Sequence, residues 1–261
     1  MYCDTHCHLN LEDFQTDLVE VIQRARDEGV RRILVPGIDL ENSRSALELA
    51  ERFDIVYAAA GVHPNSARSW NARSAETLRG LLQHPKVVAV GEIGLDHYRQ
   101  HATPQEQLPV LRAQLELAAE AGKPVILHCR EAFATLSEEI RAWAARSLGA
   151  ARGVFHAFAE GAEEVDLLRR LGMLIGVGGP LTYKNNLRLT GAVRAAGKEM
   201  LLLETDAPYL SPVPKRGGRN EPCYLRYVIP QVSNILNISA DDVENATSIN
   251  ANRLFHWDND L

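Results

Sequence analysis

The sequence is poor in cysteine and has no long hydrophobic run. Its 261 residues include 4 cysteines, at positions 3, 7, 129 and 223, and none belongs to a C-x-x-C pair. So few cysteines exclude a disulfide framework, and we expect reduced, buried thiols. No run approaches the roughly 18 apolar residues that a membrane span needs, and the first residues lack the pattern of a secretory signal. We therefore expect a cytoplasmic protein with no membrane partner.

Positive charge is also scarce. Lysine and arginine number 28 against 34 aspartates and glutamates, which leaves a net charge of -6. This balance excludes a protein that coats nucleic acid through a broadly basic surface. A nucleic-acid enzyme stays compatible if a local basic patch and a metal ion face the reacting phosphate. With 46% hydrophobic residues, the chain can bury the core of one domain spanning 1–261. No exposed apolar stripe in the sequence requires a partner subunit, so we expect a monomer.

Short runs of Val, Ile and Leu alternate with longer amphipathic stretches along the whole chain. The predicted strands are 3–8, 32–36, 57–61, 87–92, 124–128, 153–156, 173–177 and 201–204. The predicted helices are 17–28, 41–52, 74–83, 104–121, 131–146, 161–170 and 186–196, followed by a helical tail from about 222. Eight apolar strands separated by helices indicate a parallel sheet covered on its faces and predict a (β/α)8 TIM barrel. A doubly wound sheet is the alternative, but no Gly-x-Gly-x-x-Gly motif follows the first strand.

Polar residues gather where the predicted strands end. His6 and His8 share one face of the first strand because side chains two apart in a strand point the same way. The other strand-end residues are Glu92, His128, His156 and Asp206. The carboxyl ends of the strands form the active face of a barrel, so these six side chains are expected to converge. Three cysteines, at 3, 7 and 129, fall out of phase with the histidines and are expected to face the helices.

Four imidazoles and two carboxylates are too many for one tetrahedral ion, so we predict two divalent metal ions. Glu92 is the natural bridge, with His6, His8 and Asp206 completing one site and His128 and His156 the other. The ligand types favour Zn²⁺, Mn²⁺ or a similar ion over Ca²⁺, and Mg²⁺ stays compatible. Two ions can activate a shared water for hydrolysis. Asp206 is the candidate general base, and Glu92 is its catalytic partner through the bridge.

Several motifs along the chain resemble the TatD family of metal-dependent deoxyribonucleases. They are Asp4-Thr5-His6-Cys7-His8, Gly61-Val62-His63-Pro64, Gly91-Glu92-Ile93-Gly94-Leu95-Asp96, His128-Cys129-Arg130, Glu204-Thr205-Asp206-Ala207-Pro208-Tyr209-Leu210, Arg219-Asn220-Glu221-Pro222 and Asn250-Ala251-Asn252-Arg253-Leu254-Phe255. They occur in order and at compatible spacing. The resemblance implies an amidohydrolase-like barrel that hydrolyses DNA, typically as an exonuclease acting from the 3′ end.

The resemblance also carries over individual residues. The metal ligands fall on the six residues already singled out. His63 and Arg130 carry over as substrate contacts, since both lie on the predicted active face and could meet a phosphate. Each has a structural alternative: His63 could order its loop through Pro64, and Arg130 could pair with Glu131 or Glu204.

Three further basic residues are candidates for substrate binding. Arg216 and Arg219 belong to the basic cluster at 212–220, after the eighth strand, and could position a nucleic-acid backbone. Lys184, with Tyr183, follows the seventh strand and could add a phosphate contact beside a stacking surface. A solvated loop with ordinary charges is the alternative for the cluster at 212–220.

The chain departs from the family pattern near the site. Ala157-Phe158-Ala159-Glu160-Gly161 stands where Cys-Phe-Ser-Gly is usual, His97 where Tyr is usual, and Glu131-Ala132 where Asp-Ala is usual. These changes bear on substrate preference rather than on the metal ligands. A second hypothesis, suggested by other amidohydrolase-like barrels, is a hydrolase of ester or C–N bonds, such as an aminoacyl-tRNA deacylase acting on tRNA. Many amide hydrolases of this type bridge their metals through a carboxylated Lys on the fourth strand, and Glu92 stands there instead, which favours the nuclease. A third, a scaffold on an inactive barrel, is disfavoured because all six ligands are present.

Overall fold

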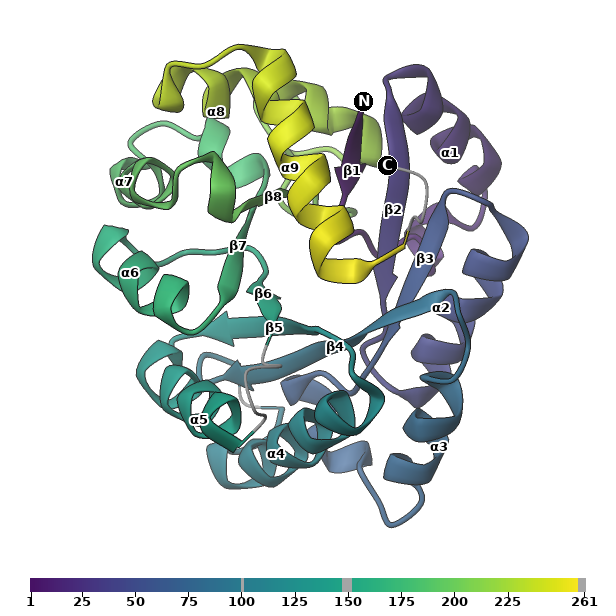
Figure 1. The fold of residues 1–261 in the computed structure, drawn as a ribbon. Helices are drawn as coiled ribbons and strands as arrows, with labels where there is room; N and C mark the ends of the chain where they lie inside the picture. Colours follow the sequence, from purple (N-terminus) through teal and green to yellow (C-terminus); the bar gives the residue numbers. More distant parts are fainter. Residues whose placement is uncertain (100, 147–151, 258–261) are drawn as a thin grey trace.

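A computed structural model describes residues 1–99, 101–146 and 152–257 of the chain. Its eight strands are all parallel and follow one another in chain order around the barrel (Figure 1). The strands are β1 (Tyr2–Asp4), β2 (Val30–Pro36), β3 (Val56–Ala60), β4 (Val87–Asp96), β5 (Val125–Arg130), β6 (Gly153–Phe155), β7 (Met173–Val177) and β8 (Leu201–Leu203). The (β/α)8 fold predicted from the alternation is confirmed.

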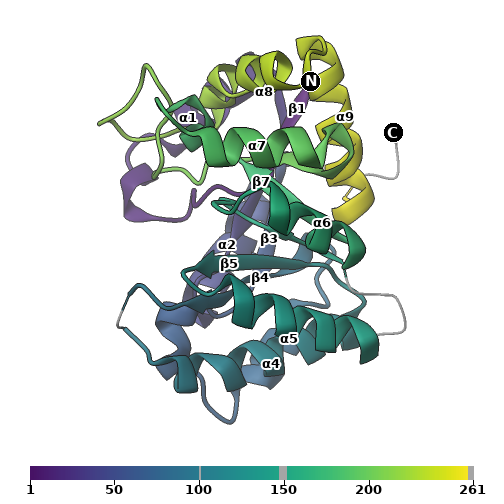
Figure 2. The same cartoon turned by 90° about the vertical axis from the view of Figure 1, so that its left-hand side faces the viewer.

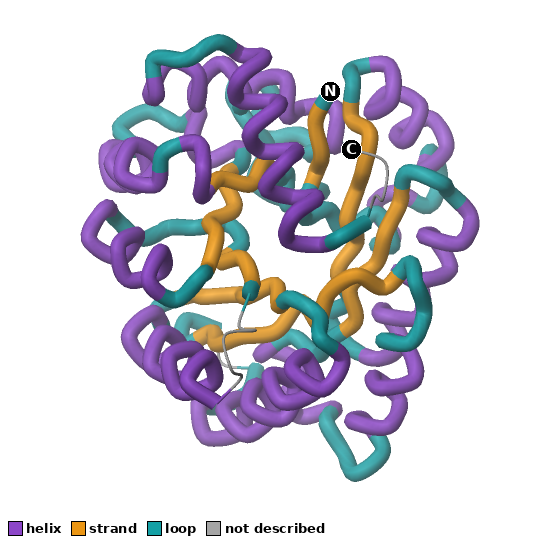
Figure 3. Tube along the Cα trace, viewed as in Figure 1, coloured by secondary structure: helices purple, strands orange, loops and turns teal. Residues whose placement is uncertain are grey.

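Helices surround the strands as an outer ring (Figure 3). They are α1 (Leu18–Asp27), α2 (Leu40–Arg52), α3 (Ser74–Leu81), α4 (Pro104–Ala121), α5 (Phe133–Arg146), α6 (Ala162–Arg170), α7 (Leu187–Ala196), α8 (Ile229–Leu236) and α9 (Ala240–Phe255). Short 3₁₀ helices stand at Glu12–Phe14, Pro64–Ser69, Gly179–Thr182, Lys198–Met200 and Pro222–Tyr227. Among the described residues, no helix is long and apolar enough to cross a membrane.

Backbone hydrogen bonds just beyond the strand ends join the first strand to the eighth. The Thr5 amide donates to the Leu203 carbonyl at 3.0 Å, and the Asp206 amide donates to the His6 carbonyl at 2.8 Å. The His8 amide donates to the Ala207 carbonyl at 2.8 Å. These bonds run through the segments that carry His6, His8 and Asp206, so closing the barrel also sets these three side chains beside one another.

Side chains alternate cleanly between the barrel interior and the helical layer. In β2, Leu34 belongs to an inner cluster, while its neighbours Ile33 and Val35 pack with the helices. The inner cluster contains Cys3, Leu34, Ala59, Val88, Ala89, Ile126, Val154 and Leu202 from the strands. Because a strand has a period of two, seven of the eight strands contribute one or two buried residues to this narrow core, and the partly buried Leu174 of β7 packs against it.

Helix α9 closes the barrel at the amino ends of the strands (Figure 2). Its Leu254 and Phe255, followed by Trp257, pack against the inner cluster. The hydroxyl of Tyr57 donates a hydrogen bond of 2.6 Å to the Trp257 carbonyl. The predicted helical tail thus completes the core at the amino ends of the strands. The candidate metal ligands lie at the opposite end of the barrel.

The packing of α9 against the inner cluster is expected to contribute strongly to the stability of the fold. Phe255→Ala removes a buried ring from the inner cluster, and we expect the free energy of unfolding to fall by about 3–5 kcal/mol. Ile249→Ala, on the exposed side of the same helix, should change it by less than about 0.5 kcal/mol. Urea denaturation followed by circular dichroism measures both. Equal effects would show that α9 does not seal the core.

Two details of the predicted strands were wrong. The first strand ends at Asp4, so the alternation does not run on to His6, and Cys3 faces the barrel interior instead of the helices. Cys7 does pack in the helical layer, and Cys129 lies against it. The fourth strand does not end at Glu92 but continues to Asp96. Gly94 allows this, because its φ is +143° and a Cβ would lie 2.0 Å from the His128 carbonyl oxygen.

Candidate metal centre

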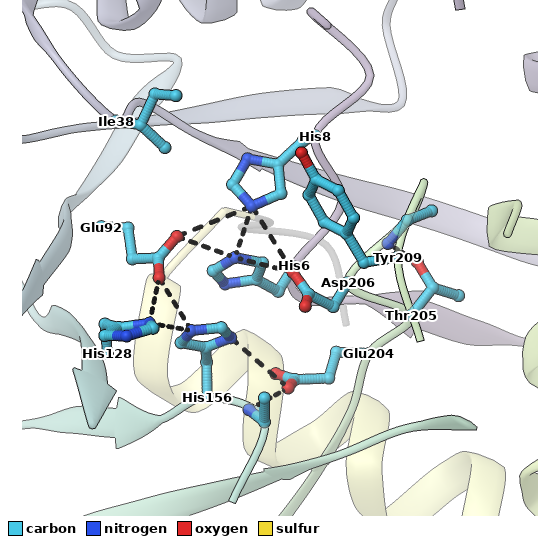
Figure 4. Close-up of polar contacts among 12 residues, drawn as sticks. His6, His8, Ile38, Glu92, His128, His156, Glu204, Thr205, Asp206 and Tyr209 are labelled. Carbon is cyan, nitrogen blue, oxygen red and sulfur yellow. Dashed lines mark hydrogen bonds and ion pairs between the residues drawn. The ribbon is translucent and has the colours of Figure 1, made fainter. Parts of the chain in front are cut away.

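Glu92 lies at the middle of a cluster of histidines (Figure 4). Its Oε2 is 3.3 Å from the Nε2 of His6 and 3.6 Å from the Nε2 of His8. Its Oε1 faces the other way, 2.9 Å from the Nδ1 of His128 and 2.8 Å from the Nε2 of His156. One carboxylate thus offers a separate oxygen to each histidine pair, which is the arrangement that a bridging ligand requires.

Asp206 completes the first half of the cluster. Its Oδ1 lies 3.6 Å from the Nε2 of His6 and 3.5 Å from the Nε2 of His8. The two imidazole nitrogens are themselves 3.1 Å apart. The ring of His156 stacks on that of His6 with centroids 3.9 Å apart, so the two halves of the cluster are in direct contact.

Burial and the charges of neighbouring groups shift the pKa values of these side chains. Burial would raise the pKa of Glu92, but the neighbouring imidazoles hold it well below its ordinary value. Burial lowers the pKa of His6 to about 4, which keeps its imidazole neutral, as a ligand must be. Burial alone would lower the pKa of His156, but the negative charge of Glu92 raises it to about 10. The carboxylates therefore create an electrostatic environment that favours positive charge.

The donor set fits divalent metal ions. Three atoms with lone pairs, Nε2 of His6, Nε2 of His8 and Oε2 of Glu92, converge within 3.1–3.6 Å of one another. Imidazole nitrogen and carboxylate oxygen are the ligands preferred by Zn²⁺ and Mn²⁺. The described residues contain three overlapping groups with this geometry: His6, His8 and Glu92; His6, His156 and Asp206; and His63, Glu92 and His128.

A cavity of about 880 Å³ opens over the cluster at the carboxyl ends of the strands. Its floor is formed by the polar residues Glu92, His128, His156 and Asp206, and its walls include apolar residues such as Leu11, Ile38 and Leu189. The volume lies in the range of pockets that bind small molecules or parts of larger ones.

A family model described as TatD related DNase matches residues 3–256. The 3′-5′ ssDNA/RNA exonuclease TatD of Edwardsiella piscicida is 41% identical over 258 residues, covering 97% of this chain and 98% of that protein. The uncharacterized metal-dependent hydrolase YabD of Bacillus subtilis is 38% identical over 255 residues, covering 98% and 99%. The chain belongs to the TatD-related DNase family. It is a metal-dependent hydrolase of the TatD type.

A solved TatD structure supports the same assignment. The TatD homolog YJJV of Escherichia coli K12 superposes with a TM-score of 0.91 at 33% identity, and the match covers 98% of both chains. The resemblance predicted from the motifs is therefore confirmed, and with it the single parallel barrel of a TatD-type hydrolase.

Asp96 is a residue of the TatD-type centre for which no role was predicted from the sequence. Its Oδ2 lies 3.1 Å from the Nε2 of His128, on the side of the ring opposite Glu92. Its Oδ1 accepts hydrogen bonds from the amides of Tyr98 at 3.0 Å and Arg99 at 2.8 Å. A carboxylate behind a ligating histidine fixes the ring orientation and raises its basicity. The sequence signal was the place of Asp96 at the end of the motif Gly91-Glu92-Ile93-Gly94-Leu95-Asp96, four residues after Glu92.

Weakening the contact between Asp96 and His128 is expected to weaken metal binding in the half of the centre that includes His128. Asp96→Asn keeps the size of the side chain but removes its charge, so we expect about 10–100-fold weaker metal binding there. Titration with Mn²⁺ monitored by calorimetry measures it. Asp39 is the N-cap of α2 and accepts from the Asn42 amide, and Asp39→Asn, which keeps a side-chain acceptor there, is the control. Unchanged affinity in Asp96→Asn would remove its positioning role.

Glu204 is a second carboxylate behind the ligands. It is buried beneath His156, with 3.8 Å between Oε1 and the Nδ1 of His156, and it accepts a hydrogen bond from the Ala157 amide. Burial raises its pKa to about 8. The backbone at the strand ends therefore holds this side chain against the histidine rather than toward solvent.

The structure brings His63 and Arg130 to the cavity. The Nε2 of His63 is 3.3 Å from the Oε1 of Glu92, and its Nδ1 accepts from the Asn65 amide at 3.0 Å, so it both faces the cluster and orders its loop. The guanidinium of Arg130 lies 3.8 Å from the ring centroid of Tyr98. Within the described ranges, Arg130 shows no ion pair with Glu131 or Glu204.

The other three basic candidates do not line the cavity. Arg219 pairs with Asp17 at 2.7 Å and with Glu221 at 3.0 Å, which ties its loop to α1. Arg216 is exposed and stacks 4.2 Å from the ring centroid of Tyr183, and Lys184 is also exposed. Their contact with a substrate stays a prediction.

The departure after His156 changes the cavity wall. Ala157 and Ala159 line the cavity, so this wall carries methyl groups where the family pattern has a thiol and a hydroxyl. The added carboxylate of Glu160 pairs with Arg188 on α7. Its charge is therefore compensated locally, and we expect it to have little influence on a bound phosphate.

Proposed function

We propose that this chain is a 3′-to-5′ exonuclease that hydrolyses the phosphodiester bonds of single-stranded DNA, with RNA as a second substrate. The observation that carries the proposal is Glu92, which presents one oxygen to each of two histidine pairs. This is the arrangement of a two-ion phosphodiesterase. The name of the Edwardsiella relative, an exonuclease of single-stranded DNA and RNA, supports the substrate and the polarity.

We assign two divalent ions, Mn²⁺, Zn²⁺ or Mg²⁺, to this centre. His6, His8, Glu92 and Asp206 would hold one, and Glu92, His128 and His156 would hold the other. When bound, such ions lower the pKa of a water molecule and neutralise charge on the phosphoryl group. One chain supplies all six ligands, so we propose that the monomer is active, which size-exclusion chromatography with light scattering can test.

The protein residues have separate tasks in this scheme. Among the described residues, Asp206 makes its ion-pair contacts through Oδ1, which leaves Oδ2 to take the proton of the attacking water. Arg130 and His63 stand beside the cavity floor, where they can bind and orient the phosphate. The apolar walls reduce the water around the reacting group and so strengthen these electrostatic contacts.

The test uses protein stripped of metal by a chelator and then supplied with Mn²⁺, Mg²⁺ or Zn²⁺. We expect a 5′-labelled single strand to shorten stepwise from its 3′ end only when metal is restored. A phosphorothioate at the 3′-terminal linkage should slow this shortening, and the same group at the 5′ end should not. An aminoacyl-tRNA is assayed in parallel. Rapid deacylation without release of nucleotides would replace the proposal with the ester hydrolase.

A further inference from the structure

Tyr209 is an aromatic residue that the metal chemistry leaves without a task. It follows Asp206 by three residues, lines the cavity and yet leaves 54% of its surface exposed. Its ring stands edge-on to that of His8 with centroids 6.2 Å apart, as Figure 4 shows. A large ring half in solvent beside a metal centre is a surface that a flat ligand can cover.

The backbone around Tyr209 is held firmly. Its amide donates to the Asp206 carbonyl at 2.9 Å, and its own carbonyl accepts from the Nδ2 of Asn220 at 2.7 Å. Asn220 is fully buried. The next residue, Leu210, has a φ of +53°, a strained value for a branched side chain. The fold therefore keeps the backbone that carries this ring at a set place relative to Asp206.

Gly179 shows how tightly this segment is packed. A Cβ at Gly179 would lie 1.9 Å from the Leu210 carbonyl oxygen, so only glycine allows the two backbones to approach this closely. The backbone next to Tyr209 is thus braced by the loop after β7, which fixes the point from which its ring projects into the cavity.

The charge of the cavity indicates what kind of contact a nucleic acid would need here. Among the described residues that line it, the basic side chains other than histidine are Arg99 and Arg130, and the whole chain has a net charge of -6. Phosphate contacts alone therefore supply little affinity. Stacking of an unpaired base on an aromatic ring is the other main source of affinity for single strands, and it tolerates any sequence.

We propose that Tyr209 is the stacking surface for the base of a nucleotide next to the scissile phosphate, and that it selects unpaired strand ends. A base inside a duplex is paired and stacked on both faces, so it must be unpaired before it can lie against this ring. The inference rests on the proposed exonuclease function, because it needs a phosphodiester at the metal centre, and it adds the residue that recognises the single strand.

The first test measures binding without turnover. An oligonucleotide with the fluorescent base 2-aminopurine at its 3′ end is titrated, in Mn²⁺, into the Asp206→Asn variant. We expect quenching of the base on binding. Adding Tyr209→Leu should abolish the quenching and weaken binding about 5- to 140-fold, while adding Tyr209→Phe should preserve both. Ile249→Ala, at the opposite end of the barrel, is the control with no expected effect.

The second test measures the coupling between ring and base. With Asp206 intact, Tyr209→Leu should lower kcat/KM for a normal 3′ end by a similar factor. This loss should largely disappear when the last or the penultimate nucleotide of the substrate is abasic. Equal losses on normal and abasic strands, or unchanged quenching in Tyr209→Leu, would each overturn the stacking role. A wild-type protein that releases no nucleotide would instead overturn the proposed function.

Discussion

Replacing Glu92 by glutamine is expected to remove metal from both halves of the centre and to abolish hydrolysis. Glutamine keeps the shape of the side chain but loses the negative charge that both histidine pairs face. The loss of activity should exceed the roughly 10–100-fold typical of residues behind a ligand, because a shared anionic ligand is lost outright. Metal content measured by atomic emission, together with release of nucleotides from labelled DNA, checks this.

Glu48→Gln provides the matched control for this substitution. Glu48 is exposed on α2, so its replacement should leave metal content and hydrolysis unchanged. The circular dichroism spectrum of Glu92→Gln should match that of the wild type, since the side chain stands at the cavity floor rather than in the apolar core. Full metal content with full activity would eliminate the bridging assignment.

Replacing Asp206 by asparagine is expected to lower kcat by about 10²–10⁴-fold. Burial would raise the pKa of Asp206, but hydrogen bonding by His8 and the charge of His156 hold it below its ordinary value, so the group is an ionised base at neutral pH. Asparagine can still offer an oxygen to a metal ion but cannot accept the proton of the attacking water. Steady-state kinetics should therefore show a fall in kcat with little change in KM.

The metal content of Asp206→Asn separates a base from a ligand. If the residue acts mainly as the base, most of the metal remains while turnover falls. Asp166→Asn, at an exposed position on α6, should leave both quantities unchanged. A variant that loses one ion and all substrate binding would make Asp206 chiefly a ligand, and one that retains kcat would exclude it as the base.

The barrel could be predicted from the sequence because its signals are local. Apolar runs and amphipathic stretches alternate along the chain, and each strand or helix can be recognised from its own residues. The exact ends of strands depend on their neighbours instead. The first strand stops at Asp4, where its segment turns toward β8, and this break reversed the orientation predicted for Cys3.

The convergence of the candidate ligands could be predicted better than their surroundings. His6 and Asp206 lie just beyond the carboxyl ends of β1 and β8, where active residues of barrels stand, whereas Glu92 lies inside β4. The role of Asp96 depends on β4 running past Glu92 along β5, which no local pattern indicates. Arg219 is engaged by Asp17, 202 residues away in sequence, so its ion pair could be found only once the chain was folded.

Helix α9 restricts access to the metal centre to one end of the barrel. Leu254, Phe255 and Trp257 close the barrel at one end, so whatever reaches the metal centre enters and leaves by the same mouth. For a strand that is shortened stepwise, each released nucleotide competes with the next phosphodiester for that single passage. We therefore expect product release to contribute to the overall rate, as it does in many enzymes.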